Sequence, residues 1–333
     1  MNRSNIPWCD HTWNPVTGCR HGCPYCYAKK ITTRFSGDVR ENLAHKERYR
    51  VVDGIYVLDE PFLGPNDEII NYPFGFEPTY HRYRLSTIGK LKGGHNIFIG
   101  AMADLLGEWV PDWVINEVLD ATNNDLNNYM FLTKNPKRYM EIAIPEKDNY
   151  FYGVTLTNNE DVRRRTEYMM YIAERVRTFA SIEPLHERLD RISLTDIGIY
   201  EWIILGAETG KRKGRPTVKK EWIEDILDSV SKPVFMKESL RPLVADFREE
   251  YPEKLRQYAE GEKVATGAEK GLRWEHCIMC RKHRPKKEMV TISIRIGRGT
   301  KGATLGFMCP ECMRAFCGEH DIPIPELEGL RNG

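Results

Sequence analysis

The sequence has little net charge, no long apolar run and no cysteine between Cys26 and Cys277. A formal charge of +1 gives no global electrostatic reason to bind nucleic acid or an anionic membrane, although a local basic patch can still do so. No run approaches the roughly 20 apolar residues of a membrane helix, and the N-terminal residues lack the apolar core of a signal peptide. We therefore expect a cytoplasmic protein with no membrane association.

The composition is that of a soluble globular protein, with 41% hydrophobic and 29% charged residues. A chain of 333 residues is long for one average domain, but a single α/β barrel accommodates most of it. We expect one large domain and a small appendage.

Apolar runs typical of buried parallel strands alternate with segments of helical period. A short strand is predicted near residues 12–17, followed by strands over 96–102, 129–133, 150–157, 176–182, 202–207 and 233–237. The predicted helices are 111–123, 136–142, 160–175 and 219–231. Repeated βα units close into a full or partial barrel with its active site at the carboxyl ends of the strands.

The fold class is therefore α/β, a partial or full (β/α) barrel with a small zinc-ribbon-like domain at its C-terminal side. The barrel spans residues 1–240 and includes a lid or insertion at about 36–95, where the period is lost. Residues 241–272 are expected to form a charged helical linker, 273–320 the zinc-ribbon-like domain and 321–333 a tail.

The nine cysteines fall mainly into an N-terminal trio and a C-terminal cluster, which in a reducing compartment points to metal rather than disulfides. Cys19, Cys23 and Cys26 are separated by three and two residues, which brings their thiolates onto one loop, and the interspersed Gly18 and Gly22 let its backbone wrap a bulky cluster. An iron–sulfur cluster normally takes four cysteines, so one iron would stay open. The alternative is a zinc knuckle or a set of unrelated buried thiols.

This cysteine spacing resembles that of the radical S-adenosylmethionine (SAM) superfamily. The blocks DHTWNPVTGC, IFIGAMADL, FLTKNPKRY, GVTLTNN, FASIEPL, WIILGAETG and PVFMKES resemble, in this order, the phage Gp37/Gp68-like (DUF5131) radical SAM family over about Ile6–Leu240. A looser likeness exists to the spore photoproduct lyase branch, which repairs DNA. The resemblance implies a fold and cofactors rather than a substrate.

The resemblance implies a [4Fe-4S] cluster on Cys19, Cys23 and Cys26 whose open iron chelates SAM. An electron from a donor such as flavodoxin or ferredoxin would cleave SAM reductively and give a 5′-deoxyadenosyl radical, which abstracts hydrogen from the substrate. Tyr25 occupies the place where the superfamily carries an aromatic residue near the adenine.

Polar residues end the predicted strands, where a barrel places its catalytic groups. The catalytic candidates are Asp104, Lys134, Glu183, Glu208 and Lys237. The candidates for binding the cofactor are Tyr25, Asp104, Thr133, Thr155, Asn158, Glu183 and Glu208. The carboxylates suit the ribose hydroxyls or the amine of SAM, and the lysines suit its carboxylate or a substrate phosphate. The alternative is a structural network of ion pairs at the barrel mouth.

The segment that precedes the cysteine loop offers two interpretations. His11 and Asn14 are candidates for contacting substrate or cluster, but the tryptophans Trp8 and Trp13 favour a packing role for this segment. Cys9 is expected to be a buried free thiol.

The C-terminal cysteines form two matched pairs, Cys277 with Cys280 and Cys309 with Cys312, separated by a segment of alternating strand character. Two such knuckles joined by strands predict a zinc ribbon, with an auxiliary iron–sulfur cluster as the alternative. The basic loop 281–287 beside one knuckle suits a nucleic-acid backbone or is simply solvated.

The leading hypothesis is a radical SAM enzyme that modifies or repairs a nucleic acid or nucleotide. A second hypothesis replaces this substrate by a peptide or small metabolite. A third is a metal-containing nucleic-acid-binding protein without catalysis.

Overall fold

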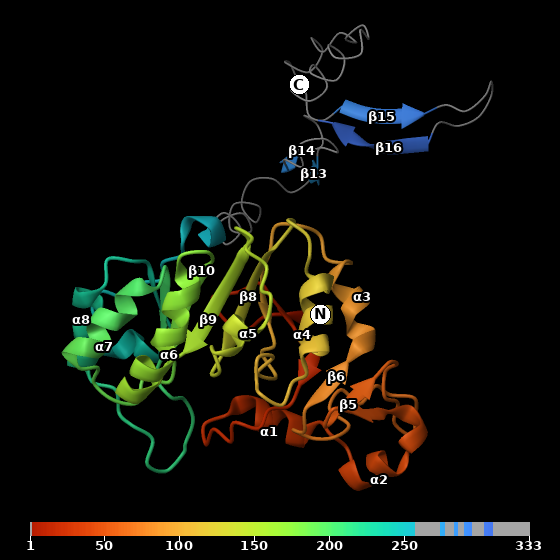
Figure 1. Cartoon of the computed structure of the whole chain (residues 1–333), viewed down its shortest axis with the longest axis horizontal. Coiled ribbons are helices and arrows are strands. Elements are labelled where there is room, and N and C mark those ends of the chain that lie inside the picture. Colours follow the sequence, from red (N-terminus) through yellow and green to blue (C-terminus); the bar gives the residue numbers. More distant parts are fainter. Residues whose placement is uncertain (1, 257–273, 277–282, 286–289, 295–302, 309–333) are drawn as a thin grey trace, which may run out of the picture. The chain divides into compact units, whose positions relative to one another are not determined.

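The computed structural model describes residues 2–256, 274–276, 283–285, 290–294 and 303–308. The chain divides into two compact units, Met1–Gly261 and Glu262–Gly333. The first unit is built on an eight-stranded sheet (Figure 1). Its strands, in spatial order, are β1 (Asn2–Arg3), β2 (His11–Trp13), β7 (Asn96–Ile99), β8 (Asn128–Thr133), β9 (Tyr150–Thr155), β10 (Arg177–Ile182), β11 (Trp202–Leu205) and β12 (Val234–Met236).

The seven strands from β2 to β12 in this sheet are parallel, and they lie side by side in the same order as along the chain. Strand β1 is an antiparallel edge strand. Helices follow the strands and cover one face of the sheet: α4 (Asp112–Ala121), α5 (Arg138–Glu141), α6 (Asn159–Ala173), α7 (Arg191–Asp196) and α8 (Lys220–Ser229) (Figure 1). This α/β half-barrel confirms the predicted fold class. The short helix α7 was not predicted.

Side chains of the parallel strands alternate between two hydrophobic cores, as the pleat of a strand requires. Ile97, Tyr129 and Tyr150 belong to the core beneath the helices, whereas Phe98, Phe151 and further residues of opposite phase form a second core. The second core fills the concave face of the curled sheet and includes Trp8, Cys9, Met130, Phe179, Trp202, Ile204 and Phe235. Both faces are therefore buried, which explains the nearly continuous apolar runs in the sequence.

The predicted insertion, at about 36–95, supplies three strands of a small second sheet, and the fourth strand comes from the segment before the cysteine loop. The strands of this sheet lie in the order β3 (Val16–Thr17), β6 (Thr79–His81), β5 (Ile55–Leu58) and β4 (Arg50–Val52). The helices α2 (Val39–Ala44) and α3 (Leu85–Ile88) belong to the insertion. Leu58, Phe62 and Phe74 make a separate small core there. Strands of two to four residues are too short to show a period, which is why the sequence did not reveal them.

Part of the segment expected as a linker packs against the base of the half-barrel. The Tyr251 ring stacks on Trp202 at a centroid distance of 5.6 Å, and Leu255 is fully buried. The Asn96 side chain donates a hydrogen bond to the Leu255 carbonyl, at 3.0 Å. Residues 244–252 contain no helix. The packing of Tyr251 and Leu255, rather than helical propensity, therefore sets the conformation of this segment.

The second unit contains two antiparallel pairs, β13 (Trp274–His276) with β14 (His283–Pro285) and β15 (Val290–Ile294) with β16 (Ala303–Met308). The last pair agrees with the predicted strand character between the two cysteine pairs. Cys277, Cys280, Cys309 and Cys312 lie outside the described residues, as does most of the basic loop, so the zinc site stays a prediction. Over the part of the chain described here, no helix has the length and hydropathy to span a membrane.

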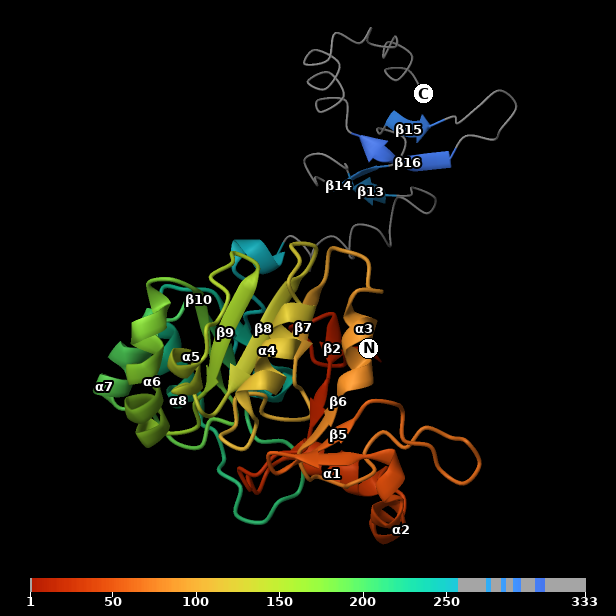
Figure 2. The same cartoon turned by 45° about the vertical axis from the view of Figure 1, so that its right-hand side comes forward.

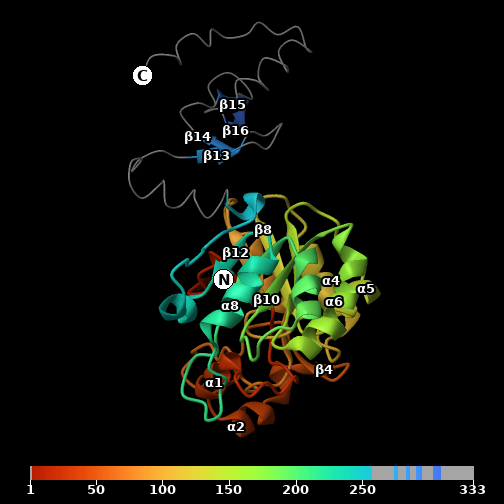
Figure 3. The same cartoon turned by 90° about the vertical axis from the view of Figure 1, so that its left-hand side faces the viewer.

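Helix α1 (Tyr27–Arg34) lies at the end of the half-barrel toward which the parallel strands point. The loop that follows β11, drawn in green, lies beside this helix in both remaining views (Figures 2 and 3). The N-terminal cysteines, which precede α1, are thus carried to the carboxyl ends of the strands.

Candidate functional site

The carboxyl ends of the parallel strands border a cavity of about 440 Å³, which we call the main cavity. Lys134, Thr155 and Glu183 face it because each is in phase with the concave-face residues of its own strand. The predicted site residues that line it are Cys19, Cys23, Tyr25, Cys26, Asp104, Thr133, Lys134, Thr155, Glu183, Glu208 and Lys237. The prediction for Asn158 is not supported, because its side chain accepts a hydrogen bond from the backbone of Asp161 and caps α6.

The first cysteine is held in place through Gly18. The backbone N–H of Gly18 donates to the Met102 carbonyl at 3.0 Å, and Gly18 forms a parallel bridge with Ala103. Its φ is +83°, and an added Cβ would lie 2.3 Å from the Glu77 carbonyl oxygen. Only glycine permits this close approach, which fixes Cys19 against the loop that follows β7.

The third cysteine begins α1. The backbone N–H of Cys26 donates to the Cys23 carbonyl at 3.2 Å, which makes a tight turn between the two residues. Cys26 is the N-cap of α1, and its side chain makes no capping hydrogen bond. The Tyr27 hydroxyl donates to the Ala101 carbonyl and joins the start of α1 to the loop after β7. The loop is therefore held by hydrogen bonds at both ends, and the Cys26 thiol is not used for capping.

The donor chemistry of the loop suits iron and sulfur. The described cysteines carry free thiols, and Cys19, Cys23 and Cys26 are all partly accessible from the main cavity. Burial raises the pKa of Cys19 to about 12, so metal binding there would release a proton. Within the described residues, no group of three or more His, Cys, Asp or Glu side chains is arranged to hold a single metal ion. Soft thiolates on a short loop fit a multi-iron cluster.

Cys9 stands apart from this trio, as expected. It is 8% exposed, and its thiol donates to the Ser4 hydroxyl at 3.2 Å. Burial raises the pKa of Cys9 to about 12. The neighbouring aromatic residues also pack: Trp8 contacts the ring of Phe98, and the Trp13 indole donates to the Thr87 hydroxyl. The burial of Trp8 and Trp13 agrees with a packing role for this segment.

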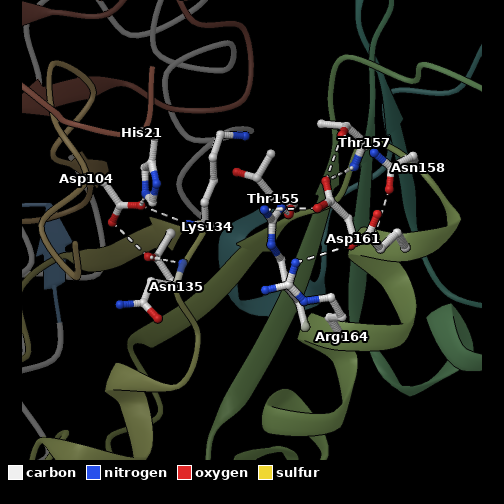
Figure 4. Close-up of polar contacts among 12 residues, drawn as sticks. His21, Asp104, Lys134, Asn135, Thr155, Thr157, Asn158, Asp161 and Arg164 are labelled. Carbon is white, nitrogen blue, oxygen red and sulfur yellow. Dashed lines mark hydrogen bonds and ion pairs between the residues drawn. The ribbon is translucent and has the colours of Figure 1, made fainter. Parts of the chain in front are cut away.

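Asp104 is a clamp rather than an open ligand. Its carboxylate accepts hydrogen bonds from the Thr133 hydroxyl at 2.7 Å and from the backbone N–H groups of Leu106 and Lys134 at 3.1 and 2.9 Å. His21 Nε2 lies 2.7 Å from Oδ2, the oxygen that also accepts from the Lys134 N–H (Figure 4). Burial alone would raise the pKa of Asp104, but these hydrogen bonds outweigh it and lower the pKa. The carboxylate ties the cysteine loop to the ends of two strands.

His21 lines the main cavity and was not predicted as a site residue. It lies between the first two cysteines, contacts Asp104 and packs edge-on against Trp109 with the ring centroids 4.9 Å apart. A polar residue inside the cysteine loop was the available signal. Its partner Asp104 is 83 positions away along the chain, so no local pattern could have paired the two residues.

Tyr25 and Lys134 meet inside the main cavity. The Lys134 ammonium lies 3.2 Å from the Tyr25 hydroxyl, and the Tyr25 ring packs edge-on against His186 at 5.2 Å. Burial lowers the pKa of Lys134 and raises the pKa of Tyr25. The aromatic ring beside the last cysteine is thus held in a defined position.

Two ion pairs face the same cavity. Lys237 Nζ lies 2.5 Å from Glu183 Oε1. Arg212 makes a bidentate contact with Glu208, at 2.6 and 2.7 Å, and this contact lowers the pKa of Glu208. The expectation of a structural ion-pair network at the barrel mouth therefore agrees with the geometry, and Glu183, Lys237 and Glu208 of these pairs border the main cavity.

A second cavity of about 480 Å³ adjoins the first and shares His21 and Lys134 with it. The residues that line it are Arg20, His21, Glu108, Trp109, Lys134, Asn135, Arg164 and Arg165. Arg165 is anchored there by a hydrogen bond to the Thr155 carbonyl, at 2.7 Å. We call this space the basic cavity, since its lining has four cationic side chains and one carboxylate.

A half-barrel sheet, a cavity at its carboxyl end and a three-cysteine loop that lines this cavity together define a βα-barrel protein with an N-terminal thiolate site. The family described as a protein of unknown function (DUF5131) matches residues 3–236. The chain belongs to this family, which confirms the resemblance recognised in its sequence blocks.

The solved structures to which the chain is similar include mutants of spore photoproduct lyase. One shares 10% sequence identity and a TM-score of 0.42, over 96% of this chain and 74% of that one. Another, with bound AdoMet and a dinucleoside spore photoproduct, shares 9% identity and a TM-score of 0.35, over 93% and 71% of the two chains. No curated protein matches the sequence.

Proposed function

We propose that the protein is a radical SAM enzyme that modifies or repairs a nucleic acid or nucleotide. One observation carries the proposal: Cys19, Cys23 and Cys26 all line the cavity at the carboxyl ends of the parallel strands, beside Tyr25. A barrel places its chemistry at these strand ends, and three cysteines leave one iron of a [4Fe-4S] cluster without a protein ligand.

The residues present fit these cofactors by their chemistry. The three thiols would ligate the cluster, which with SAM supplies one-electron cleavage of a sulfonium and a hydrogen-abstracting radical when bound. Asp104 and His21 would hold the loop that carries the ligands, because they join it to β7 and β8.

The walls of the main cavity suit a zwitterionic cofactor. Glu183 and Lys237 offer a carboxylate and an ammonium within one pair, so the pair can accept an amine and donate to a carboxylate. The Tyr25 ring offers a flat surface for a heterocycle, and Lys134 holds its hydroxyl. These side chains would bind and orient SAM.

Apolar side chains close the floor of the same cavity. Trp8, Phe98 and Leu132 line it, and Trp8 and Phe98 belong to the concave-face core. Such a floor excludes water from the side opposite the mouth, which protects a reactive radical from solvent.

A run of cations at the mouth favours a nucleic acid as substrate. The loop after β11 contains the cavity-lining Glu208 and continues beyond it through Lys211, Arg212, Lys213 and Arg215 without a further acidic residue. Helix α1, which lies beside this loop, exposes Lys29 and Lys30 (Figure 3). Cations on both sides of a cavity mouth suit a polyanionic backbone.

The C-terminal part of the chain has a proposed role in the same function. Cys277, Cys280, Cys309 and Cys312 would bind Zn²⁺, or an auxiliary iron–sulfur cluster, and so stabilise a small ribbon that presents the substrate. The support for this proposal is the spacing of the four cysteines.

The experiment is a SAM-cleavage assay. Protein reconstituted anaerobically with iron and sulfide, reduced with dithionite and given SAM is expected to release 5′-deoxyadenosine. The Cys23→Ala variant should release none, and Cys9→Ala is the control that should behave as wild type. Equal product from wild type and Cys23→Ala would refute the enzymatic proposal. Mass spectrometry of nucleosides from cells with and without the gene then tests the substrate class.

A further inference from the structure

We infer that the basic cavity is a phosphate-binding subsite, which takes a phosphodiester of the nucleic acid substrate while the adjoining nucleoside enters the main cavity. This inference rests on the proposed function, because it names how that substrate is held. The residues concerned come from the cysteine loop, the end of β8 and the start of α6 (Figure 4).

The cations of the basic cavity come from three separate elements and converge on one space. Arg20 belongs to the cysteine loop, Lys134 follows β8, and Arg164 and Arg165 lie on α6. Residues this far apart along the chain meet only because the strands end at a common edge. The Asn135 side chain is a further polar group of the wall. Several donors around one space are what a phosphate group requires.

The partners of these cations leave donors available. Arg165 uses one N–H for the Thr155 carbonyl and contacts Asp161 at 2.9 Å, which positions its guanidinium. A guanidinium has five N–H donors, so several remain. Arg164 lies 3.3 Å from Glu160, and both side chains are 76% exposed. An exposed pair of this kind is worth little and yields readily to a phosphate.

Arg20 is similarly available. Its guanidinium lies 3.6 Å from Glu77, a long contact between two exposed side chains, and also donates to the Gly54 carbonyl. Lys134 contacts a hydroxyl rather than a carboxylate. Glu108 is the one carboxylate among the residues that line the basic cavity, and its negative charge would repel an anion bound there.

The position of the basic cavity explains why it would serve the reaction. Lys134 and His21 line both cavities, so a group bound in one lies next to a group bound in the other. A phosphate fixed in the basic cavity would hold the attached nucleoside at the mouth of the main cavity. Such positioning orders the substrate before hydrogen abstraction.

The test uses the full chain with a fluorescein-labelled single-stranded oligodeoxynucleotide, and measures the dissociation constant over a range of salt concentrations. The double variant Arg20→Gln, Arg164→Gln should bind about tenfold more weakly and with a salt slope smaller by about 1.4, since each lost phosphate contact on a single strand removes about 0.7 of a released counterion. Glu108→Gln should bind several-fold more tightly. Arg163→Gln is the matched control, because Arg163 lies on the same helix but pairs with Asp190.

The inference is overturned if the double variant loses no more affinity than Arg163→Gln, or if Glu108→Gln leaves the dissociation constant unchanged. If a mononucleotide competes as effectively as an unlabelled oligonucleotide, the subsite binds a free nucleotide. If only the oligonucleotide competes, the subsite binds a phosphodiester. Both outcomes support a phosphate site. Release of 5′-deoxyadenosine without substrate is measured in the same variants. If the wild-type protein releases no 5′-deoxyadenosine, the proposed function is rejected, whereas the result on phosphate binding is unaffected.

Discussion

His21 Nε2 lies 2.7 Å from Asp104 Oδ2, and this contact joins the cysteine loop to the carboxyl ends of β7 and β8. The loop that carries the thiols is thereby fixed relative to the cavity that they line. Asp104 has no oxygen left over, because Oδ1 accepts from the Thr133 hydroxyl and the Leu106 N–H, and Oδ2 also accepts from the Lys134 N–H. Its role is to position the loop.

The first prediction concerns this clamp. Asp104→Asn replaces an acceptor by a donor that faces the Lys134 N–H, and is expected to destabilise the fold by about 2–4 kcal/mol, because buried charged hydrogen bonds are lost. Urea unfolding measures the change. Iron bound per chain after reconstitution should fall as well. An unchanged midpoint together with full iron content would show that the clamp does not position the loop.

The second prediction separates two glycines of the cysteine loop. Both have positive φ, +83° at Gly18 and +71° at Gly22, but only at Gly18 would a Cβ meet backbone atoms, at 2.3 Å. Gly18→Ala should therefore cost more than about 3 kcal/mol of unfolding free energy, whereas Gly22→Ala should cost about 1 kcal/mol from the backbone conformation alone. Equal losses in the two variants would contradict the close approach seen at Gly18.

The third prediction concerns the reactivity of Cys9. Burial raises the pKa of Cys9 to about 12, so its thiol stays protonated at pH 8 and the reactive thiolate appears only as the pH rises toward that value. In the metal-free protein, Cys9 should react with iodoacetamide far more slowly than the accessible Cys23, as measured by mass spectrometry of peptides. Rapid alkylation of Cys9 at pH 8 would place it outside the core.

The fourth prediction follows from Glu208 and Arg212. Their contact lowers the pKa of Glu208 below its ordinary value of 4.5, so its stabilising effect is present above pH 4.5 and is lost as the pH falls through the lowered pKa. Arg212→Gln should lower the urea midpoint of unfolding at pH 7, and should lower it less at an acidic pH below the lowered pKa of Glu208. Unfolding at both pH values measures this. A cost that does not depend on pH would mean that Arg212 acts through packing alone.

The alternation of strands and helices allowed the half-barrel to be predicted, because both faces of each strand are buried and the runs stand out as apolar. The same regularity located Lys134, Thr155 and Glu183, whose phase continues that of their strands. Local patterns of this kind survive in a single sequence.

The contacts between distant residues could not be predicted in this way. The contact between His21 and Asp104 joins two loops. Arg165 reaches the site from α6, and the hydrophobic pattern of a helix identifies only its buried side. Asn158 shows a different difficulty, since a polar residue after a strand can be a helix cap as well as a ligand, and this one caps α6. Side-chain roles depend on packing that the sequence does not record.

The most direct test of the central claim is electron paramagnetic resonance of the reconstituted, dithionite-reduced protein with and without SAM. We predict a signal of a reduced [4Fe-4S] cluster whose g-values change when SAM is added, and the loss of this SAM-sensitive signal in Cys23→Ala but not in Cys9→Ala. A spectrum that SAM leaves unchanged, or a SAM-sensitive signal that persists in Cys23→Ala, would contradict an open iron site on Cys19, Cys23 and Cys26.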